Sequence, residues 1–545
     1  MERLEFNTKW FSTVASIWIQ CTSGSLYTFS IYSPAIKSTQ GYDQSTLDTV
    51  SVFKDIGANC GILSGVLYTK ATTHQHEPTS TITIGPWVVL LVGAIQCFAG
   101  YFFMWASVTG LIPPPPVAVM CLFMFVAAHA QSFFNTANVV TSVRNFPTYS
   151  GTAVGIMKGF LGLSGAMLIQ VYQTVFNNKP NSYLLLLALL PSINPMILMW
   201  FVIIHNVSEE DEKKYLDIFS LIALVLAAYL MIIIILEHMF SFQFPVRVIA
   251  FVLLMVLLVS PIFVAIRAQE RNSDIVSERN QFLDESKVLA RHYPTGYQSL
   301  PSGSGCDSSV NEKNSLDNVE GLNLFKAVQT VDFWILFLAM ACGMGSGLAT
   351  VNNMSQVGGS LGYGGFETNT LVSLWSIWNF LGRFGAGYIS DYFLLTRGWA
   401  RPSFMVITLA GMTIGHVVIA SGLPGALYAG SVLVGVCYGS QWSLMPTIAS
   451  EIFGVAHMGT IFNTITIASP VGSYIFSVKV VGYIYDREAS GEGSSCSGTH
   501  CFMLSFLIMA SATFLGSLAA LGLFFRTKSF YDRIVLGRLR CSTRE

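Results

Sequence analysis

The chain has 545 residues, of which 52% are hydrophobic and 11% are charged, and its formal net charge at pH 7 is −1. Soluble domains carry about 25% charged residues, so this composition indicates a polytopic membrane protein. The sequence has no basic patch with interleaved aromatic residues, so we expect no nucleic-acid partner. It also has no G-x-x-x-x-G-K-[S/T] motif, which argues against an ATP-driven pump.

Fourteen apolar segments are candidates for membrane spans, because a span needs about 20 apolar residues. The first one continues past Ser30 with no cleavage site, so we interpret it as a span and not as a signal peptide. We predict an all-α fold with spans at residues 10–36, 46–69, 84–109, 115–143, 150–177, 183–206, 215–237, 244–268, 329–355, 367–391, 401–422, 425–447, 455–485 and 500–526.

The spans divide into six, two and six. We predict an N-terminal six-helix half, two inserted central spans, a cytoplasmic linker, a C-terminal six-helix half and a basic cytoplasmic tail, at residues 1–206, 207–268, 269–328, 329–526 and 527–545. The linker is rich in Ser, Asn, Glu, Asp and Gly, and we expect disorder at least over 301–318. Its serines are candidates for phosphorylation, and a plain connection between the halves is the simpler interpretation.

Short glycine-containing motifs recur between the two halves, in the same order and at nearly constant spacing. The pairs are Gly24-Ser25 with Gly345-Ser346, Gly41-Tyr42 with Gly362-Tyr363, Gly65 with Gly387, and Gly151-Thr152 with Gly459-Thr460. They indicate two copies of one six-helix unit. Parallel halves with a binding site between them near mid-membrane are a transporter architecture.

The distribution of positive charge predicts the orientation. Of the 29 lysines and arginines, Lys37, Lys179, Arg247 and Arg487 fall on the outer side, while Lys54, Lys158, Arg383 and Lys479 fall within spans. The other 21 lie on the inner side if the N-terminus is inside. Because cytoplasmic loops carry the excess of Lys and Arg, we predict that both termini are cytoplasmic.

Residues 379–401, NFLGRFGAGYISDYFLLTRGWAR, combine a glycine-faced helix with charged residues. We predict that Asp391 ends this helix and either holds the N-terminus of a neighbouring helix or pairs with Arg397 or Arg401. Such a contact would be a latch between conformations; the alternative is a tight helix pair with a solvated end. The pattern Gly387-x-x-x-Asp391 followed by basic residues resembles the cytoplasmic loop motif of major facilitator superfamily transporters. The first half has Thr69 where the second has Asp391.

Longer stretches carry a more specific resemblance. They are YTFSIYSPAIKSTQGY from Tyr27, FKDIGANCGILSG from Phe53, RNFPTYSGTAVGIMKGFLGLSG from Arg144 and YGSQWSLMPTIASEIFGVAHMGTIFNTITIASPVGSYIFSVKVVGYIYD from Tyr438. The chain resembles the plant nodulin-like membrane proteins, a branch of the major facilitator superfamily similar to monocarboxylate and oxalate/formate carriers. The resemblance implies a plant source and a transporter fold, and it implies no particular substrate.

Charged residues inside spans are candidate site residues, because a charge in a span faces the bundle interior or a water-filled cavity. Lys158 and Lys479 lie on the fifth span of each half, and snorkelling to the interface is the alternative for both. Asp55 is a candidate proton-coupling carboxylate, and we do not expect it to pair with its neighbour Lys54. Arg383 is a candidate for carboxylate recognition, with a structural role beside Asp391 as the alternative.

A second set of candidates is polar and uncharged. The resemblance implies that the first and fourth spans of each half line a cavity, which places near substrate the residues Gln20, Tyr27, Asn135, Asn138, Asn352, Tyr438 and Gln441. Polar groups in spans face inward in any case, because lipid cannot satisfy them. An inward-facing position alone therefore does not define a ligand.

The sequence also offers one candidate disulfide. Cys496 and Cys501 share the polar loop GEGSSCSGTHC on the predicted outer side, where oxidising conditions permit a bridge; two free thiols are the alternative. No Cys/His cluster has metal-site spacing, and His500 is interpreted as a solvated loop residue. We expect no cofactor.

These features together predict a secondary active transporter of a small polar or anionic solute, with a carboxylate as one candidate and protons as a candidate co-transported ion. It would be a multi-pass monomer of the plasma membrane or of the vacuolar or endomembrane system. The alternative is a transport-inactive membrane sensor or signalling scaffold that acts through residues 269–328. No paired carboxylates or His-rich motif lie inside the spans, so we do not expect an enzyme.

Overall fold

The computed structural model of the chain describes residues 8–42, 44–73, 85–175, 180–205, 211–240, 242–292, 321–489 and 496–535, and these residues form helices and no strand. The first half consists of α1 (Lys9–Thr22), η1 (Ser25–Thr28), α2 (Phe29–Gln40), α3 (Gln44–Asn59), α4 (Ile62–Thr73), α5 (Pro86–Val108), α6 (Val117–Asn145), α7 (Ser150–Val175), α8 (Pro180–Leu198) and η3 (Met199–Phe201).

Two long helices follow the first half, and the second half begins after them. The inserted helices are α9 (Glu212–Phe240) and α10 (Phe244–His292). The second half consists of α12 (Leu324–Val328), α13 (Val331–Ser360), α14 (Gly365–Arg397), α15 (Pro402–Ala420), α16 (Ala426–Phe453), α17 (Met458–Thr466), α18 (Ala468–Ser473), the π-helical η4 (Tyr474–Gly482), α19 (Tyr483–Ala489), α20 (His500–Phe530) and η5 (Tyr531–Val535).

Every predicted span contains helix, but some are broken. The first is interrupted between α1 and α2, the second at Cys60 and Gly61, and the thirteenth between α17 and α18. Pro470 explains the last break, because proline has no N–H to donate to the carbonyl of Thr466. By length and composition, 11 helical segments of the described residues qualify as membrane spans. The count of fourteen therefore stays a prediction.

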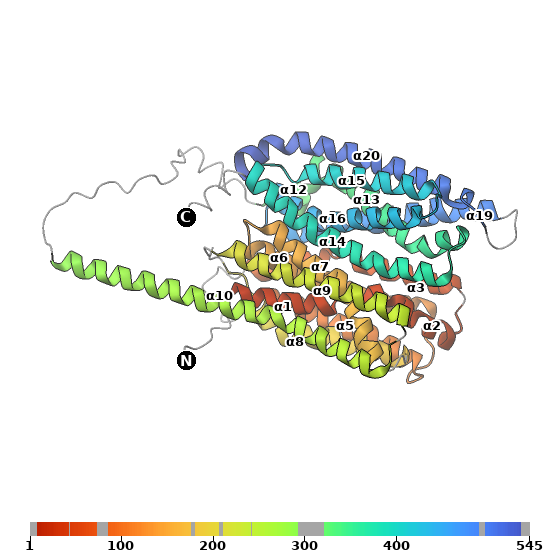
Figure 1. Cartoon of the computed structure of the whole chain (residues 1–545), viewed down its shortest axis with the longest axis horizontal. Coiled ribbons are helices and arrows are strands. Elements are labelled where there is room, and N and C mark those ends of the chain that lie inside the picture. Colours follow the sequence, from red (N-terminus) through yellow and green to blue (C-terminus); the bar gives the residue numbers. More distant parts are fainter. Residues whose placement is uncertain are drawn as a thin grey trace.

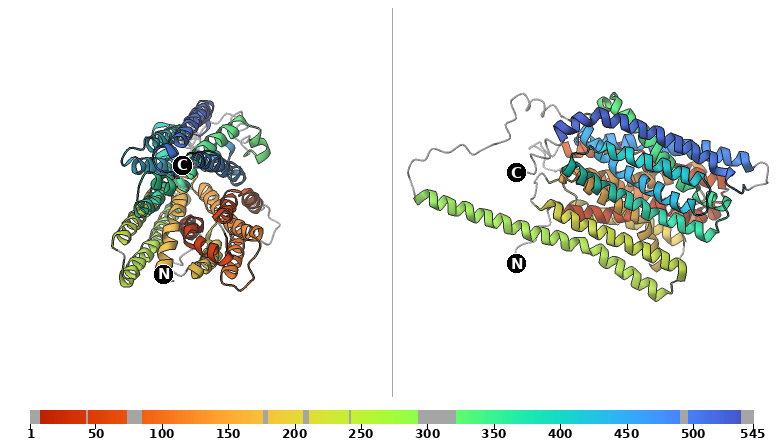
Figure 2. Two further views of the ribbon diagram at one scale, coloured as in Figure 1. Left: turned by 90° about the vertical axis from the view of Figure 1, so that its right-hand side faces the viewer. Right: turned by 45° about the horizontal axis from the view of Figure 1, so that its top comes forward.

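The helices run side by side along one direction, and the two halves are seen end-on in Figure 2. One hydrophobic core joins the first half to α9 and α10, and a second core fills the second half. We name as the terminal end the end of the bundle where α1 begins and α20 ends. Helix α10 projects beyond the bundle at this end (Figure 1). It continues as helix to His292, past the predicted end of its span at 268. The segment 301–318, for which we expect disorder, lies outside the described residues.

The predicted repeat has a counterpart at the contacts between the halves. A Cβ added at Gly151 would overlap the backbone of Gly387, and one added at Gly65 would overlap that of Gly459. Each pair joins a glycine of one half to a glycine of the other, so two pseudo-symmetric backbone contacts close the interface near the terminal end. Gly41 and Gly362 likewise both have positive φ after the first predicted span of their half.

Candidate functional site

Lys158 occupies the interface between the two halves. Its side chain is buried, with 1% of its surface exposed, and its Nζ lies 5.1 Å from the centroid of the Trp442 ring and 5.0 Å from that of Phe462. Both rings belong to the second half. Snorkelling to the membrane surface is therefore wrong for Lys158, because its ammonium group points across the interface and not along α7 to its end.

Arg383 lies in the same place and approaches from α14. Its guanidinium also faces the Trp442 ring, at 5.4 Å. It donates from Nε to Asn379 Oδ1 (2.9 Å), from Nη1 to the Lys158 carbonyl (3.3 Å) and from Nη2 to the Tyr27 hydroxyl (3.2 Å). A structural pairing of Arg383 with Asp391 is therefore wrong, because its guanidinium is held by these three other groups.

Aromatic residues surround this Lys158–Arg383 cluster. Tyr27, from η1, keeps 43% of its surface exposed although its hydroxyl reaches Arg383. Tyr438 is buried and its ring contacts that of Trp442, with centroids 6.4 Å apart. The structure thus brings together Tyr27, Lys158, Arg383 and Tyr438 from the predicted set. Among the described residues, no carboxylate lies within ion-pair distance of Lys158 or Arg383.

Other predicted charged residues lie elsewhere. Lys479 is exposed on η4, with its Nζ 5.8 Å from the ring of Tyr474, and it does not join Lys158. Asn352 is also exposed, on α13. The expectation that Lys54 and Asp55 do not pair is wrong, because Lys54 Nζ and Asp55 Oδ1 are 3.3 Å apart. These neighbours are both partly exposed, so their long side chains can bend toward each other despite diverging from the helix.

Four predicted polar residues are buried with incomplete hydrogen bonding. Gln20 and Asn138 have no partner for either polar side-chain atom, and Asn135 has none for its oxygen. Gln441 directs Nε2 to Met412 Sδ at 3.1 Å, while its oxygen lacks a partner. Unsatisfied buried amides are costly, so these positions retain hydrogen-bonding capacity for water or a solute.

Asp391 joins the halves at the terminal end. It lies inside α14, which continues to Arg397, so the prediction that it ends the helix is wrong. Its Oδ1 accepts from the backbone N of Gly151 at 3.1 Å and its Oδ2 from that of Thr152 at 2.5 Å. These N–H groups belong to the first turn of α7, where a helix has no internal acceptors and its dipole favours an anion.

Asp391 also belongs to a buried chain of charges within the second half. Arg401 donates from Nη2 to Asp391 Oδ1 (2.5 Å) and from Nε to Glu451 Oε1 (2.6 Å), and the Tyr531 hydroxyl donates to Glu451 Oε2 (2.6 Å). Arg397 is exposed and packs over Phe393 instead, so it is not the partner of Asp391.

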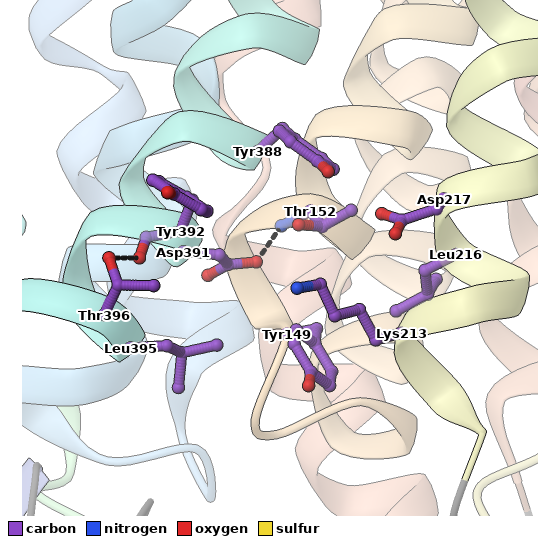
Figure 3. A pocket seen from close by; sticks show the side chains of 10 residues that line it. All are labelled: Tyr149, Thr152, Lys213, Leu216, Asp217, Tyr388, Asp391, Tyr392, Leu395 and Thr396. Carbon is purple, nitrogen blue, oxygen red and sulfur yellow. Dashed lines mark hydrogen bonds between the residues drawn. The ribbon is translucent and has the colours of Figure 1, made fainter.

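A small pocket opens beside Asp391, between α7, α9 and α14 (Figure 3). Lys213 and Asp217 reach it from the inserted helix α9, and Tyr388 and Asp391 reach it from α14. The inserted helix therefore lies next to the contact that joins the two halves.

A second contact between the halves joins α4 and α6 to α17 and the loop before it. Asn463 Nδ2 donates to Thr136 Oγ1 at 2.7 Å, and Thr136 is in turn hydrogen-bonded to Ser64 Oγ at 2.7 Å. Arg144 Nη2 also donates to the Ala456 carbonyl at 3.3 Å. With the contact between α7 and α14, these bonds close the interface on the side of the terminal end.

Sequence reasoning missed several of these residues. Trp442 and Phe462 read as ordinary apolar positions, and Asn463 stands among apolar residues without a charge to mark it. Glu451 lies just beyond the predicted end of its span at 447, and Tyr531 lies in the predicted tail. A charged residue directly after a span was the one available signal for Glu451.

Cys496 and Cys501 are joined by a disulfide, with their Cα atoms 6.0 Å apart. With His500 they are the one group of described residues whose ligand atoms could surround a metal ion. The thiolate is the metal-binding form of cysteine, so the bonded sulfurs do not suit that role.

Comparisons with known proteins agree with this architecture. The structure is similar to the proton:xylose symporter XylE bound to a sugar analogue, with a TM-score of 0.54, 12% identity, and coverage of 94% of this chain and 95% of that one. It is also similar to the human organic anion transporter MFSD10 (TM-score 0.51, 10% identity, 94% and 100% coverage). The chain thus has the major facilitator fold and is an integral multi-pass membrane protein.

Sequence comparison gives the family. Residues 9–266 match the model described as Nodulin-like, and residues 316–533 match that described as NFD4, C-terminal domain. The chain belongs to the nodulin-like family. It is 26% identical to Protein NUCLEAR FUSION DEFECTIVE 4 of Arabidopsis thaliana, over 96% of this chain and 90% of that protein. It is also 32% identical to the Probable transporter MCH1 of Yarrowia lipolytica over 168 residues, 29% of this chain and 33% of that one.

Proposed function

We propose that this protein is a secondary active transporter of a small organic anion, which binds at the Lys158–Arg383 cluster and crosses the membrane by alternating access. The observation that carries the proposal is the pair of buried cations with no carboxylate in contact among the described residues. Buried charges of one sign are costly unless an opposite charge accompanies them. A bound carboxylate would supply that charge.

The hydrogen bonds of Arg383 suit such a ligand. A guanidinium has five N–H donors, and three are directed to Asn379, the Lys158 carbonyl and Tyr27. One N–H on each terminal nitrogen is left for a solute, and these three bonds fix the plane of the group. Guanidinium groups bind carboxylates in this planar way, and the Lys158 ammonium would add a second contact.

The arrangement of contacts favours a state that opens away from the terminal end. The two inter-half contacts lie toward that end, whereas Tyr27, at the cluster, has 43% of its surface exposed. If the termini are cytoplasmic, as the distribution of positive charge predicts, this state faces outward. The monomeric state, and the plasma membrane or the vacuolar or endomembrane system as location, also remain proposals. The comparisons give the sensor alternative no support.

Protons are the proposed coupling ion. Asp55 is the sequence-based candidate for the coupling group, but its contact with Lys54 offsets its charge. Asp55 stays a candidate, and a second candidate for the proton site is sought elsewhere in the bundle.

Uptake by the purified protein in proteoliposomes tests the proposal, with radiolabelled mono- and dicarboxylates compared with neutral sugars and amino acids. We expect uptake of a carboxylate, and a loss of at least tenfold in both Lys158→Gln and Arg383→Gln. Arg383→Lys keeps the charge but not the planar fork, and we expect an intermediate loss. Lys479→Gln is the matched control, because that lysine is exposed. Uptake of a neutral solute that survives Lys158→Gln and Arg383→Gln would overturn the proposal.

A further inference from the structure

His129 lies on α6 opposite the break in the second span. Helix α3 ends at Asn59 and α4 begins at Ile62, which leaves Cys60 and Gly61 between them. His129 Nε2 lies 3.0 Å from the carbonyl oxygen of Cys60. A carbonyl only accepts hydrogen bonds, so this ring nitrogen is the donor and carries a proton. The imidazole therefore hydrogen-bonds to the second span at the break between α3 and α4.

The other ring nitrogen faces a side-chain amide, which can accept a hydrogen bond from a protonated nitrogen or donate one to an unprotonated nitrogen. His129 Nδ1 lies 2.9 Å from Oε1 of Gln96, on α5. With the oxygen in this position both neighbours are acceptors, and a ring that donates to both is an imidazolium. If the amide turns over, its NH₂ group donates to a neutral ring. Gln96 can thus satisfy His129 with one proton or with two.

The ring packs against two aromatic residues. Phe125 stacks on it, with centroids 5.5 Å apart and an interplanar angle of 14°, and Phe133 meets it edge-on at 5.1 Å. An aromatic face attracts a cation. The elements packed around it carry these other titratable or charged groups: Cys97 and Tyr101 on α5, Asp48, Lys54 and Asp55 on α3, Tyr68 and Lys70 on α4, Cys60 at their junction, and Cys121 and Arg144 on α6.

The same break touches the other half of the protein. A Cβ added at Gly61 would overlap the side chain of Asn463, which comes from α17. The Gly61 carbonyl accepts from Ser64 Oγ at 2.7 Å, and Ser64 and Asn463 both bond to Thr136. His129 therefore holds one residue of a two-residue break, and the contact between the halves is built on the next residue.

We propose that His129 is a proton-binding site of this protein, doubly protonated in the state with the terminal end closed and singly protonated when the halves separate there. Only the biological role of this site, which is to couple proton binding to alternating access, rests on the proposed transport function. The hydrogen bond to Cys60 fixes the break in the shape that accepts Asn463. The neutral ring also donates to Cys60, but the charged ring forms the stronger, charge-assisted hydrogen bond, so the second proton favours this contact. Because linkage is reciprocal, that proton is bound more tightly when the contact forms.

The first test measures the protonation of His129 directly in the full-length protein in lipid nanodiscs. ¹⁵N NMR of histidine-labelled protein distinguishes imidazole from imidazolium, and His129→Gln assigns one of the nine histidines by difference. We expect the His129 resonance to titrate between pH 5 and 8. Gln96→Glu places a carboxylate beside the ring and is expected to raise the midpoint by about one pH unit or more, whereas Gln96→Leu removes the acceptor and lowers it.

The second test measures the contact between the halves without any solute. Ala456 is exposed, and its carbonyl accepts a hydrogen bond from Arg144 of the other half. A trifluoromethyl-phenylalanine placed at this position reports by ¹⁹F NMR whether the two halves are in contact at the terminal end. We expect two resonances, with the closed form increasing as the pH falls from 8 to 5, and a ratio that no longer depends on pH in His129→Gln. His416→Gln, a buried histidine in the second half, and His457→Gln, next to the probe, are the controls.

Two results would overturn the proposal. One is a His129 ring that keeps a single proton from pH 5 to pH 8; the other is a ¹⁹F ratio that responds to pH equally with and without His129. If His129→Gln does not fold, the Gln96 variants decide whether His129 binds the proton. Gln96→Glu is expected to raise the midpoint of the titration and Gln96→Leu to lower it, and the absence of both shifts would overturn the proposal. Both measurements are made without a carboxylate solute. The protonation of His129 can therefore be supported while anion uptake is refuted, or refuted while anion uptake is supported.

Discussion

The Oδ2 atom of Asp391 accepts a hydrogen bond from the backbone N of Thr152 at 2.5 Å, and the two residues belong to opposite halves of the molecule. The carboxylate is almost fully buried, so it does not lie at a solvent edge as the sequence suggests for the end of a helix. The bond lies in the interface that would open at the terminal end under the proposed alternating access. We therefore predict that it exists in one access state and is lost in the other.

Asp391→Asn is expected to open the terminal end. The amide keeps an oxygen for Thr152 but removes the charge that Arg401 and the start of α7 both use. Hydrogen bonds to charged groups contribute about 1.5–3 kcal/mol, so the balance of states should shift by roughly ten- to a hundredfold. Alkylation of Ser443→Cys measures this, because Ser443 is buried beside Gly387 in the closed interface.

Thr69→Ala is the matched control for Asp391→Asn. Thr69 occupies the equivalent position in the first half, but its hydroxyl bonds to the Gly65 carbonyl of its own helix. We expect no change in alkylation. Equal effects of the two variants would contradict an asymmetric latch.

Glu451→Gln is expected to destabilise the protein more than Tyr531→Phe. Glu451 is one of two carboxylates that accompany buried Arg401, and removal of a partner from a buried ion pair costs about 3–5 kcal/mol. Tyr531 contributes one hydrogen bond to the same carboxylate, and its loss should cost about 1.5–3 kcal/mol. Thermal unfolding in detergent compares the variants. The reverse order would show that Arg401 is held mainly by Asp391.

The buried pair of Lys9 and Glu212 ties the inserted helix α9 to α1, with Nζ and Oε1 2.7 Å apart. Lys9→Met removes the ammonium partner of Glu212 and is expected to destabilise the protein. The double variant Lys9→Met/Glu212→Gln should cost less than the sum of the single variants. A thermal-unfolding cycle of the four proteins measures the coupling, and strict additivity would mean that the pair does not interact energetically.

Cys496 and Cys501 are expected to be linked in the isolated protein. Mass spectrometry of an unreduced digest, alkylated before cleavage, should show the cross-linked peptide. Cys342 and Cys437, which are free cysteines in the structure, should appear only as single peptides. Recovery of Cys496 and Cys501 as two alkylated thiols would contradict the pairing.

Both termini are expected to lie in the cytosol, since lysine and arginine concentrate on the side of the terminal end. Protease accessibility of tags at each terminus in sealed vesicles measures this. Protection of one tag with cleavage of the other would refute an even number of spans.

Helix positions were predictable because apolar runs of span length leave few alternatives in a membrane. Proline and glycine explain the breaks afterwards, but they did not predict them, since both also occur inside unbroken helices such as α16 with Pro446. Asp391 was recognisable from its glycine-rich context. The pairing of Asp391 with Arg401 and not with Arg397 was not predictable. It depends on where α14 ends, which the local sequence pattern does not determine.

The central cluster was only partly predictable. Lys158 and Arg383 were visible as charges inside apolar segments, but their proximity arises from two helices that are far apart in the sequence. Trp442, which lies under both cations, has no distinguishing mark among other aromatic residues. Lys479 looked equivalent to Lys158 because it lies on the corresponding span, but it lies in the π-helical η4 and is exposed.

The length of α10 determines where the chain meets soluble enzymes. Its 49 residues extend about 74 Å at 1.5 Å per residue, whereas a bilayer with its headgroups is about 40–45 Å thick. If the helix crosses the bilayer from its first residue, its end at His292 lies roughly 30 Å beyond the lipid surface. A soluble kinase of ordinary size could approach that end without touching the membrane.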